Sequence, residues 1–514
     1  MTNLAGHPDV SPIGRTPISW EMSMDRRDFL HVAALAPLAA AASRTGTLGV
    51  SAPPPNWARL RTQLAGTLVL PGDAGYNTAR RLYNPAFDRI RPGGVAYCAN
   101  AADVSACVTF ARTSGVPVTA RSGGHSYAGW STGTGLVIDV SRMSTVTYDG
   151  PRSSGPSQGA AKLDPHAGGR ATIGAGAKLI DVYDKLARHG VSIPAGSCPT
   201  VGIGGLTLGG GIGVVSRKYG LTCDTLESVR VVTADGRVLT CDAARNAGLY
   251  WACRGGGGGN FGVAVSFTFR TFEARDVTVF FLHWPWSKAG AVVKAWQSWG
   301  PSAPDELWSS LHLARSASGL DAAVVGTYVG GRAALDRLLA PLVAKAGRPS
   351  SRSARTVPYL EGMKVMGGCA AMTIDQCRRM PREAFSAKSH MAYGKLPADG
   401  IRTLVNRVER GGRHAVLLDA MGGAIGRVGP AATAFPHRAA LFSVQYYEEG
   451  TDRGWLRSLH SDMSKYFGDH AYVNYIDPEL QTWRNAYYGP NAARLAEVKS
   501  TYDPDRLFRL PQGI

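Results

Sequence analysis

The stretch Ala120-Arg-Ser-Gly-Gly-His-Ser-Tyr-Ala-Gly129 follows a short strand-like segment at residues 116–119. Consecutive glycine and serine residues let backbone N–H groups turn toward an anion, so such a loop can bind a pyrophosphate without a helix dipole. Arg121 adds positive charge to this loop. His125 lies at its tip, where a core histidine is not expected. The alternative interpretation is a plain glycine turn that carries a surface histidine.

A second stretch, Ile193-Pro-Ala-Gly-Ser-Cys-Pro-Thr-Val-Gly-Ile-Gly-Gly-Leu-Thr-Leu-Gly-Gly-Gly-Ile-Gly213, has seven glycines between residues 202 and 213. A flexible linker is polar and serine-rich, whereas valine, isoleucine and leucine alternate with these glycines. The segment is therefore expected to be buried and ordered. Glycine there allows a flat ring to lie on the backbone. Cys198 is placed to bond such a ring, and a buried structural cysteine is the alternative.

A third glycine-rich stretch, Arg254-Gly-Gly-Gly-Gly-Gly-Asn-Phe-Gly262, leads into a strand-like run at residues 263–269, but is a weak signal by itself. The usual dinucleotide-binding signature is absent, because Leu179 and Ser216 occupy the positions where its third glycine is required. This disfavours a Rossmann dehydrogenase. No cysteine spacing fits a zinc ribbon, so no metal site is expected.

The composition indicates a large folded protein. The 514 residues are 44% hydrophobic, which is enough to bury two or three cores. The formal net charge is +18, but arginine and lysine are scattered along the chain, which argues against nucleic-acid binding. An acidic partner remains open, because net charge alone attracts such partners.

The N-terminal residues carry an export signal. Asp25-Arg-Arg-Asp-Phe-Leu30 has the twin-arginine form, and the apolar run at residues 32–42 is too short to remain as a membrane span. We expect residues 1–45 to be a signal peptide and the mature protein to be secreted, or to lie at the outside of the cell envelope, without stable membrane insertion. A membrane anchor is the alternative. Export permits disulfides among the eight cysteines, but their pairing stays open.

The patterning predicts an α+β fold in two domains joined to a C-terminal segment. Residues 46–58 are a linker, residues 59–273 alternate short strands with helices, and residues 274–470 alternate long strands with long helices. The second pattern is typical of an antiparallel sheet covered by helices. Residues 471–514 are expected to return to the first domain.

The C-terminal segment contains a candidate base. In Ala471-Tyr-Val-Asn-Tyr475-Ile-Asp477, a tyrosine near a substrate hydroxyl can take its proton if the surroundings lower the tyrosine pKa from about 10. The alternative is that these aromatic residues only pack and have satisfied hydroxyls.

These segments together resemble the berberine bridge enzyme-like flavin oxidases of the vanillyl-alcohol oxidase superfamily, which have a PCMH-type FAD domain, and in particular the bacterial sugar oxidases. The resemblance rests on residues 121–126, 196–205, 260–263, 443–446 and 474–475, and on the closing motifs at residues 487–491 and 502–508. It implies FAD held by two covalent bonds, at His125 and at Cys198. The paired histidine and cysteine motifs are much more specific than either alone.

The resemblance also implies the roles of the other site residues. Tyr475 matches the base of the family's sugar oxidases, Tyr393 is a loosely aligned second catalytic tyrosine, and a valine at position 201 indicates an oxidase. The residues expected to bind the cofactor besides His125 and Cys198 are Arg121, Ser122, Gly123, Gly124, Ser126, Gly129, Pro199, Thr200, Val201, Gly202, Gly204, Gly205, Gly209, Asn260, Gly262, Val263 and Asn474.

The function implied is oxidation of an alcohol on a carbohydrate or glycosylated metabolite, with oxygen as acceptor and hydrogen peroxide as product. Two alternatives remain: an oxidase or dehydrogenase that acts on a non-sugar metabolite, and a flavin-binding protein without such catalysis. By strand alternation, the side chains expected to face the substrate are Ser389, Met391 and Tyr393, or Ser443, Gln445 and Tyr447.

Overall fold

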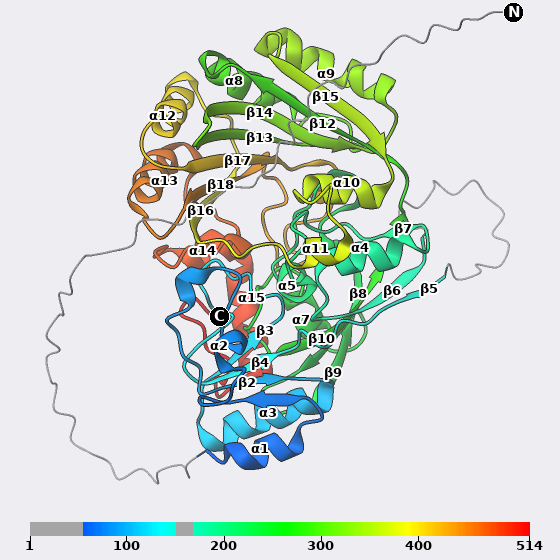
Figure 1. Cartoon of the computed structure of the whole chain (residues 1–514), viewed down its shortest axis with the longest axis vertical. Coiled ribbons are helices and arrows are strands. Elements are labelled where there is room, and N and C mark those ends of the chain that lie inside the picture. The colour runs from blue at the N-terminus through cyan, green and yellow to red at the C-terminus, as the bar shows by residue number, and fades with distance from the viewer. Residues whose placement is uncertain (1–54, 151–167) are drawn as a thin grey trace, which may run out of the picture. The chain divides into compact units, whose positions relative to one another are not determined.

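The computed structural model describes residues 55–150 and 168–514 of the chain (Figure 1). The predicted signal peptide, with its twin-arginine motif, and most of the predicted linker lie outside the described residues. In the part that is described, no helix is both long enough and apolar enough to cross a membrane.

The first described elements form a four-stranded sheet with helices beside it. Their bounds are α1 (Trp57–Gln63), β1 (Thr67–Val69), α2 (Tyr76–Ala79), β2 (Gly94–Tyr97), α3 (Ala101–Ser114), β3 (Val118–Arg121) and β4 (Leu136–Asp139). The strand order is β1-β2-β4-β3, in which β2, β4 and β3 run parallel. Because β3 ends at Arg121, the loop that carries His125 leaves from the carboxyl end of a parallel strand.

A five-stranded antiparallel sheet follows, in the order β5-β6-β10-β8-β9. The bounds of this part are β5 (Val146–Asp149), β6 (Arg170–Gly174), α4 (Leu179–Ala187), β7 (Val191–Ser192), α5 (Ile203–Leu208), α6 (Ser216–Tyr219), β8 (Leu226–Val232), β9 (Val238–Asp242), α7 (Ala247–Ala252), β10 (Val263–Arg270) and β11 (Phe272–Glu273). Helix α4 has a strongly one-sided apolar pattern, with Leu179, Val182 and Leu186 buried.

The third sheet has seven strands, all antiparallel, in the order β15-β12-β14-β13-β17-β18-β16. The bounds are β12 (Val277–Trp284), α8 (Ala289–Trp299), β13 (Leu307–Ser316), β14 (Gly319–Tyr328), α9 (Arg332–Ala346), β15 (Ser351–Val357), α10 (Tyr359–Met366), α11 (Ile374–Arg378), β16 (Phe385–Ala392), α12 (Ala398–Val408), β17 (His414–Ala420), β18 (Phe442–Glu449) and α13 (Gly454–Phe467). Helices α8, α9, α12 and α13 cover one face of this sheet and share its core (Figure 1). The predicted antiparallel sheet with helical cover is therefore confirmed.

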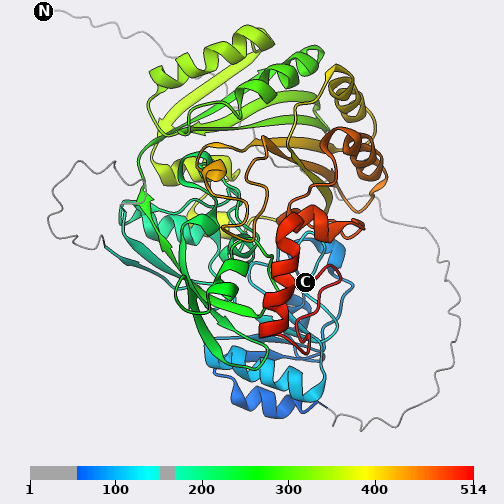
Figure 2. The same cartoon turned by 180° about the vertical axis from the view of Figure 1, so that it is seen from behind.

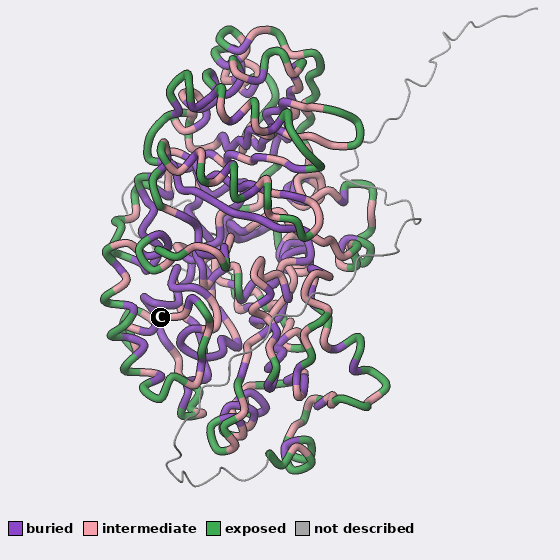
Figure 3. Tube along the Cα trace, turned by 90° about the vertical axis from the view of Figure 1, so that its left-hand side faces the viewer, coloured by how far each residue is buried: buried purple, intermediate pink, exposed green. Residues whose placement is uncertain are grey.

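The C-terminal segment packs back on the first part of the chain, as the sequence predicts. It comprises a short 3-10 turn at Val473–Tyr475, α14 (Trp483–Tyr488) and α15 (Ala492–Tyr502), drawn in red in Figure 2. The buried Lys499 of α15 donates hydrogen bonds to the carbonyl oxygens of Asn260 and Phe508 and pairs with Asp503. Figure 3 shows buried residues, in purple, running through the interior of the described chain and exposed residues, in green, at its edges.

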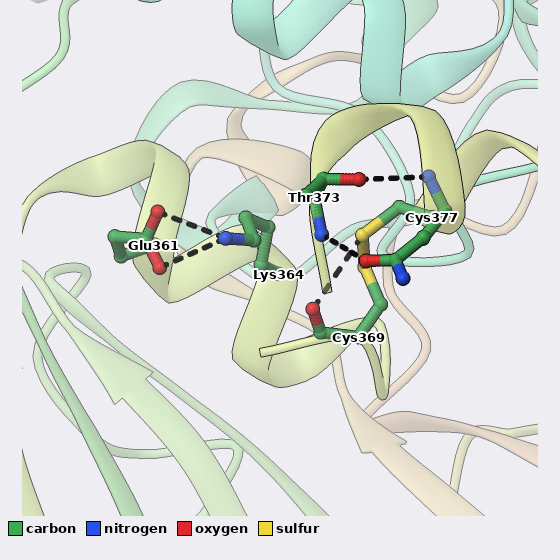
Figure 4. Close-up of a disulfide and its surroundings, with 6 residues drawn as sticks. Glu361, Lys364, Cys369, Thr373 and Cys377 are labelled. Atoms are coloured by element: carbon green, nitrogen blue, oxygen red, sulfur yellow. Dashed lines mark hydrogen bonds and ion pairs between the residues drawn. A yellow bond between two sulfur atoms is a disulfide. The ribbon is translucent and has the colours of Figure 1, made fainter. Parts of the chain in front are cut away.

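One disulfide lies in the described residues, between Cys369 and Cys377 (Figure 4). It closes the turn between α10 and α11, and Thr373 caps α11 by accepting a hydrogen bond from Gln376 N at 3.2 Å. A side chain at Gly367 would collide with the Ser197 carbonyl oxygen, so this turn lies against the loop that carries Cys198. Cys198 is itself a free, partly exposed cysteine.

Candidate active site

The loops that carry His125 and Cys198 lie directly against each other. A Cβ at Gly123 or at Gly202 would come closer than 3.0 Å to the other glycine's backbone nitrogen. Neither glycine has a positive φ, so what the position requires is close approach and not an unusual backbone angle. Two glycine-rich motifs 79 residues apart, by the difference between positions 202 and 123, thus meet at a single backbone contact.

The side chains of His125 and Cys198 share one neighbour. The Thr200 hydroxyl lies 3.0 Å from His125 Nε2 and 3.7 Å from Cys198 Sγ. The ring of Tyr83 stacks on the His125 ring at a centroid distance of 4.0 Å. Both candidate attachment residues are partly exposed, so one planar group can reach both from the open side.

Burial governs the protonation of this pair. Desolvation, with the nearby charge of Lys178, lowers the pKa of His125 to about 3, so its imidazole is neutral at pH 7 and a ring nitrogen has a free lone pair. Burial raises the pKa of the Cys198 thiol, while hydrogen bonds from Thr200 and Val201 oppose the rise. The imidazole is therefore uncharged at pH 7, and the cysteine is held as a thiol.

The remaining residues of the His125 loop build its shape. The Arg121 guanidinium pairs with Asp139 and donates to the Ala79 carbonyl oxygen, so most of its hydrogen-bonding groups have partners within the protein. Ser122 donates to the Ala175 carbonyl oxygen, and Ser126 accepts from Trp130 N. Gly124 and Gly129 have φ values of 71° and 73°, which a glycine adopts at little cost.

Two buried polar atoms near this loop support the fit of a phosphate-bearing cofactor. Among the described residues, Arg121 Nη1 and Thr132 Oγ1 have no hydrogen-bond partner. Buried polar groups are otherwise almost always satisfied. Together with the neutral His125 beside Cys198, these atoms make the loop pair suitable for FAD.

The second glycine-rich stretch folds partly into helix α5. Pro199, Thr200 and Val201 form the turn before it, and Gly202 is its N-cap. Gly204 lies against the Ala175 carbonyl oxygen, whereas Gly205 is exposed with open space around its Cα. Gly209 lies under the side chain of Asn474, which donates to the Leu206 carbonyl oxygen at 3.0 Å.

The third glycine-rich stretch holds the chain terminus. Asn260 Nδ2 donates to the Gly256 carbonyl oxygen, and its Oδ1 accepts a hydrogen bond from Ile514 N. Gly262 has a φ of 147°, and Val263 begins β10 with its side chain buried. The contacts of Asn260 thus join this loop to the C-terminal segment, and a contact with FAD stays a prediction.

Tyr475 reaches the site from the C-terminal segment. Its ring stacks on that of Tyr127 at 5.3 Å, and Tyr127 belongs to the His125 loop. Tyr472 packs edge-on against Tyr475, with the two ring centroids 5.0 Å apart. Tyr472 in turn accepts hydrogen bonds from the backbone nitrogens of Gly211 and Ile212, so the segment is anchored to the second glycine-rich stretch.

The surroundings of Tyr475 differ from what a tyrosine base requires. Burial, assisted by Asp419 and Tyr127, raises the pKa of Tyr475 well above its usual value. The sequence-based condition for a base, a lowered tyrosine pKa, is therefore not met by the protein groups around it. A proton acceptor beside the tyrosine is needed for it to act as a base.

Asp419 of β17 is a carboxylate close enough to Tyr475 to help raise its pKa, and sequence reasoning missed it. Burial raises its pKa to about 6, against hydrogen bonds from Ser310 and Ser443. It interacts electrostatically with Tyr475. The signal in the sequence was a single carboxylate in the otherwise apolar strand Ala415-Val-Leu-Leu-Asp-Ala-Met421.

Tyr393 contacts a pair of histidines, His437 and His470. Its hydroxyl is 2.9 Å from His437 Nδ1, its ring packs on His470 at 4.7 Å, and its side chain is 40% exposed. It follows the end of β16, where its ring contacts these histidines rather than Tyr475. The loose alignment that selected Tyr393 therefore does not place it beside the candidate base.

The strand residues predicted to face a substrate are divided between roles. Gln445 Nε2 donates to the Tyr127 hydroxyl at 2.8 Å, and the Tyr447 hydroxyl donates to Glu383. Ser389 accepts a hydrogen bond from Tyr472 N. Met391 is fully buried in the core, which rules out contact with a substrate. Ser443 Oγ lies 3.4 Å from Asp419 and is also fully buried.

Comparison with known proteins agrees with this architecture. Residues 92–242 match a family model described as an FAD binding domain, and residues 471–514 match one described as berberine and berberine like. YgaK of Bacillus subtilis (strain 168), an uncharacterised FAD-linked oxidoreductase, is 36% identical over 471 residues, which cover 88% of this chain and 98% of YgaK. The chitooligosaccharide oxidase of Gibberella zeae is 31% identical over 454 residues, or 82% of this chain and 87% of that protein.

Solved structures show the same fold. The berberine bridge enzyme-like protein 1 of Physcomitrella patens has a TM-score of 0.80 and 31% identity, with 89% of this chain and 98% of that chain covered. A xylooligosaccharide oxidase from Myceliophthora thermophila C1, in complex with xylobiose, has a TM-score of 0.77 and 28% identity, with coverage of 88% and 98%.

Proposed function

Because the chain belongs to the berberine bridge enzyme-like family of FAD-linked oxidoreductases, we propose that it oxidises an alcohol on a carbohydrate or glycosylated metabolite. Oxygen is the acceptor and hydrogen peroxide the product. The observation that carries the proposal is the stack of Tyr475 on Tyr127, which brings the Tyr475 phenol beside the His125 loop.

The FAD of this enzyme is bound covalently at both His125 and Cys198. Support comes from their common contact with Thr200 and from the neutral state of the imidazole. When bound, FAD would supply the acceptor for the two electrons of the alcohol. The protein groups tune and orient it.

The residues of the chain handle the proton of the substrate hydroxyl. Tyr475 accepts this proton while its own phenol proton passes to Asp419, whose pKa of about 6 suits proton uptake near neutral pH. Gln445 holds Tyr127 in position, and the stacked Tyr127 ring keeps Tyr475 oriented. Their packing also excludes water from one side of the reacting hydroxyl.

Two features favour a sugar and oxygen. The similar proteins of Gibberella zeae and Myceliophthora thermophila are oligosaccharide oxidases. Aromatic rings and polar side chains line the site together, which suits the apolar faces and hydroxyls of a sugar. Val201 follows the Cys198 turn and is partly exposed, and its small size is consistent with oxygen access.

Sugar oxidation is tested by mixing the purified holoenzyme with mono- and oligosaccharides. We expect bleaching of the flavin absorbance without oxygen, and release of hydrogen peroxide when oxygen is admitted. Bleaching without peroxide would indicate a dehydrogenase instead. If no saccharide bleaches the flavin while a non-sugar alcohol does, the proposed substrate class is wrong.

Covalent attachment is tested by the intact mass of the acid-denatured protein. The wild type and each of the single variants His125→Ala and Cys198→Ala should retain one FAD, and the double variant should retain none. A Cys223→Ala variant serves as control, because Cys223 is a buried free cysteine. Loss of all flavin from either single variant would show that only one bond exists.

We also propose that the mature enzyme is exported by the twin-arginine route. This rests on Arg26 and Arg27 and the apolar run after them. Replacing both arginines by lysine should retain the protein in the cytoplasm in a fractionation experiment. An unchanged distribution would argue against this route.

A further inference from the structure

A continuous series of aromatic contacts connects Tyr475 to the other end of the site. Tyr475 stacks on Tyr127, and Phe385 packs edge-on against Tyr127 with ring centroids 4.9 Å apart. Phe385 also stacks on Tyr447 at a centroid distance of 5.0 Å. Tyr447 and Tyr83 both bond to Glu383, and Tyr83 stacks on His125. We call the six ring-bearing residues Tyr475, Tyr127, Phe385, Tyr447, Tyr83 and His125 the aromatic arc, and Glu383 joins Tyr447 to Tyr83 within it.

Glu383 is held between two phenols. The Tyr447 hydroxyl donates to its Oε1. Burial, the neighbouring Cys198 and a hydrogen bond to Glu383 together raise the pKa of Tyr83, so Tyr83 keeps its proton and acts as a donor. A carboxylate has about four acceptor positions, so Glu383 can accept further hydrogen bonds from a ligand.

The charge of Glu383 is not neutralised by a neighbouring cation. In residues 55–150 and 168–514, Glu383 forms no salt bridge, and the arginines close to it in sequence or sheet pair with other groups. Arg382 pairs with Asp88, and Arg413 pairs with Glu449. Lys178, near His125, donates to the Arg378 carbonyl oxygen. Glu383 is partly exposed, so a ligand can reach it.

We propose that Glu383 and the aromatic arc make this enzyme select sugars that carry an ammonium group, that is, amino sugars with a free amine. This inference rests on the proposed sugar oxidation. A neutral sugar is recognised well by neutral acceptors such as Gln445. An ammonium group binds more strongly than a neutral group beside Glu383, because charge-assisted hydrogen bonds are about twice as strong as neutral ones. The faces of aromatic rings also attract cations.

The experiment compares two oligosaccharides with the same backbone, glucosamine trimer and N-acetylglucosamine trimer. The first carries ammonium groups and the second carries neutral amides at the same positions. For the wild type, we expect kcat/KM to be at least tenfold higher for the glucosamine trimer, mainly through KM. This preference should weaken as salt is added, because screening reduces the attraction of partly exposed charges.

Glu383→Gln removes the charge and keeps the shape. We expect it to reduce the ratio of the two kcat/KM values at least tenfold. The matched control is Glu497→Gln, which removes one negative charge from the exposed face of α15 and should leave the ratio unchanged. Binding is measured independently by perturbation of the flavin absorbance when either trimer is added without oxygen to Tyr475→Phe.

The outcomes separate the two proposals. If neither trimer nor any other sugar bleaches the flavin, the proposed function fails. If sugars are oxidised but the wild type shows no salt-sensitive preference for the glucosamine trimer, the ammonium proposal alone is overturned. The same holds if the preference exists but persists in Glu383→Gln. Should Glu383→Gln not fold, the wild type still tests the ammonium proposal: absence of a salt-sensitive preference for the glucosamine trimer would overturn it.

Discussion

At the residue scale, burial sets the protonation state of each ionisable group in the site. Tyr475 has a raised pKa and does not ionise by itself, while Asp419 has a pKa of about 6 and is charged at neutral pH. His125 is neutral because burial and Lys178 lower its pKa to about 3. A neutral imidazole, a phenol and a carboxylate thus coexist within the candidate site, in the protonation states that the proposed roles require.

Tyr475→Phe should retain its flavin but lose turnover. A positioned base contributes about 10²- to 10⁴-fold to rate, so we expect kcat to fall by that order. The comparison is steady-state peroxide release per covalently bound flavin. Tyr466→Phe is the control, because its hydroxyl bonds Asp399 at the surface. Unchanged turnover in Tyr475→Phe would exclude the base role.

Asp419→Asn should change the pH profile. The raised pKa of Asp419 means that the carboxylate is protonated below about pH 6 and ionised above it. As a proton acceptor it must be ionised, so wild-type kcat/KM should rise as the pH passes through about 6. In Asp419→Asn, activity should be lower and this rise should be absent. Glu448→Gln is the control, because burial raises the pKa of Glu448 to about 7 and its titration falls nearby. If that variant loses the rise instead, the assignment to Asp419 is wrong.

At the scale of elements, the loop pair and the strand ends determine the site. The turn after β3 and the turn before α5 touch through Gly123 and Gly202. Their contact brings His125 close to Cys198, with the Thr200 hydroxyl next to both side chains. The disulfide-closed turn between α10 and α11 supports the second loop from behind.

Gly202→Ala should separate the two loops. The added Cβ would collide with Ser122 Oγ and with Gly123 N, and backbone cannot move aside cheaply. We expect a lower fraction of protein with FAD bound through both residues, measured by intact mass and by the flavin to protein absorbance ratio. Gly248→Ala is the control, because its Cβ would make only an ordinary contact at 3.7 Å with Val498. Full double attachment in Gly202→Ala would show that the close contact is not needed.

At the scale of the whole described chain, the seven-stranded sheet separates two cores. One core lies between this sheet and its covering helices, and the other joins the FAD-binding part to the C-terminal segment. A buried ion pair links the sheet to the segment that carries Tyr475. Lys388 of β16 lies 2.6 Å from Asp477 and 2.9 Å from Glu479, with its side chain 6% exposed.

Lys388→Met should destabilise the protein strongly. Removing one partner of a buried pair leaves an uncompensated charge and typically costs about 3–5 kcal/mol. The measurement is the free energy of unfolding of the holoenzyme in denaturant, followed together with activity because Asp477 is two residues from Tyr475. Arg457→Ala is the control, because Arg457 pairs with Glu479 at the surface and should matter little. Equal stability of both variants would contradict the role of the buried pair.

The cofactor motifs and the fold class were readable from the sequence for a local reason. Glycine, histidine and cysteine at fixed spacing determine loop geometry over a few residues, and apolar periodicity determines whether a segment is helix or strand. The family resemblance around His125 and Cys198 and the antiparallel sheet covered by helices therefore agree with the structure.

What only the tertiary structure decided was which side chains meet. Asp419, Glu383 and Tyr475 come from three distant segments of the chain. Strand pairing and loop packing bring Asp419 near Tyr475 and bring Glu383 to Tyr447 of the aromatic arc. Tyr393 was selected by a loose alignment, which could not show that it contacts His437 and His470, and its catalytic role stays a prediction. Met391 was misjudged because a face that points toward the site is still buried where the chain packs over it. Local sequence patterns fix local geometry, whereas the proximity of residues far apart in sequence arises only when non-local strand and loop contacts form.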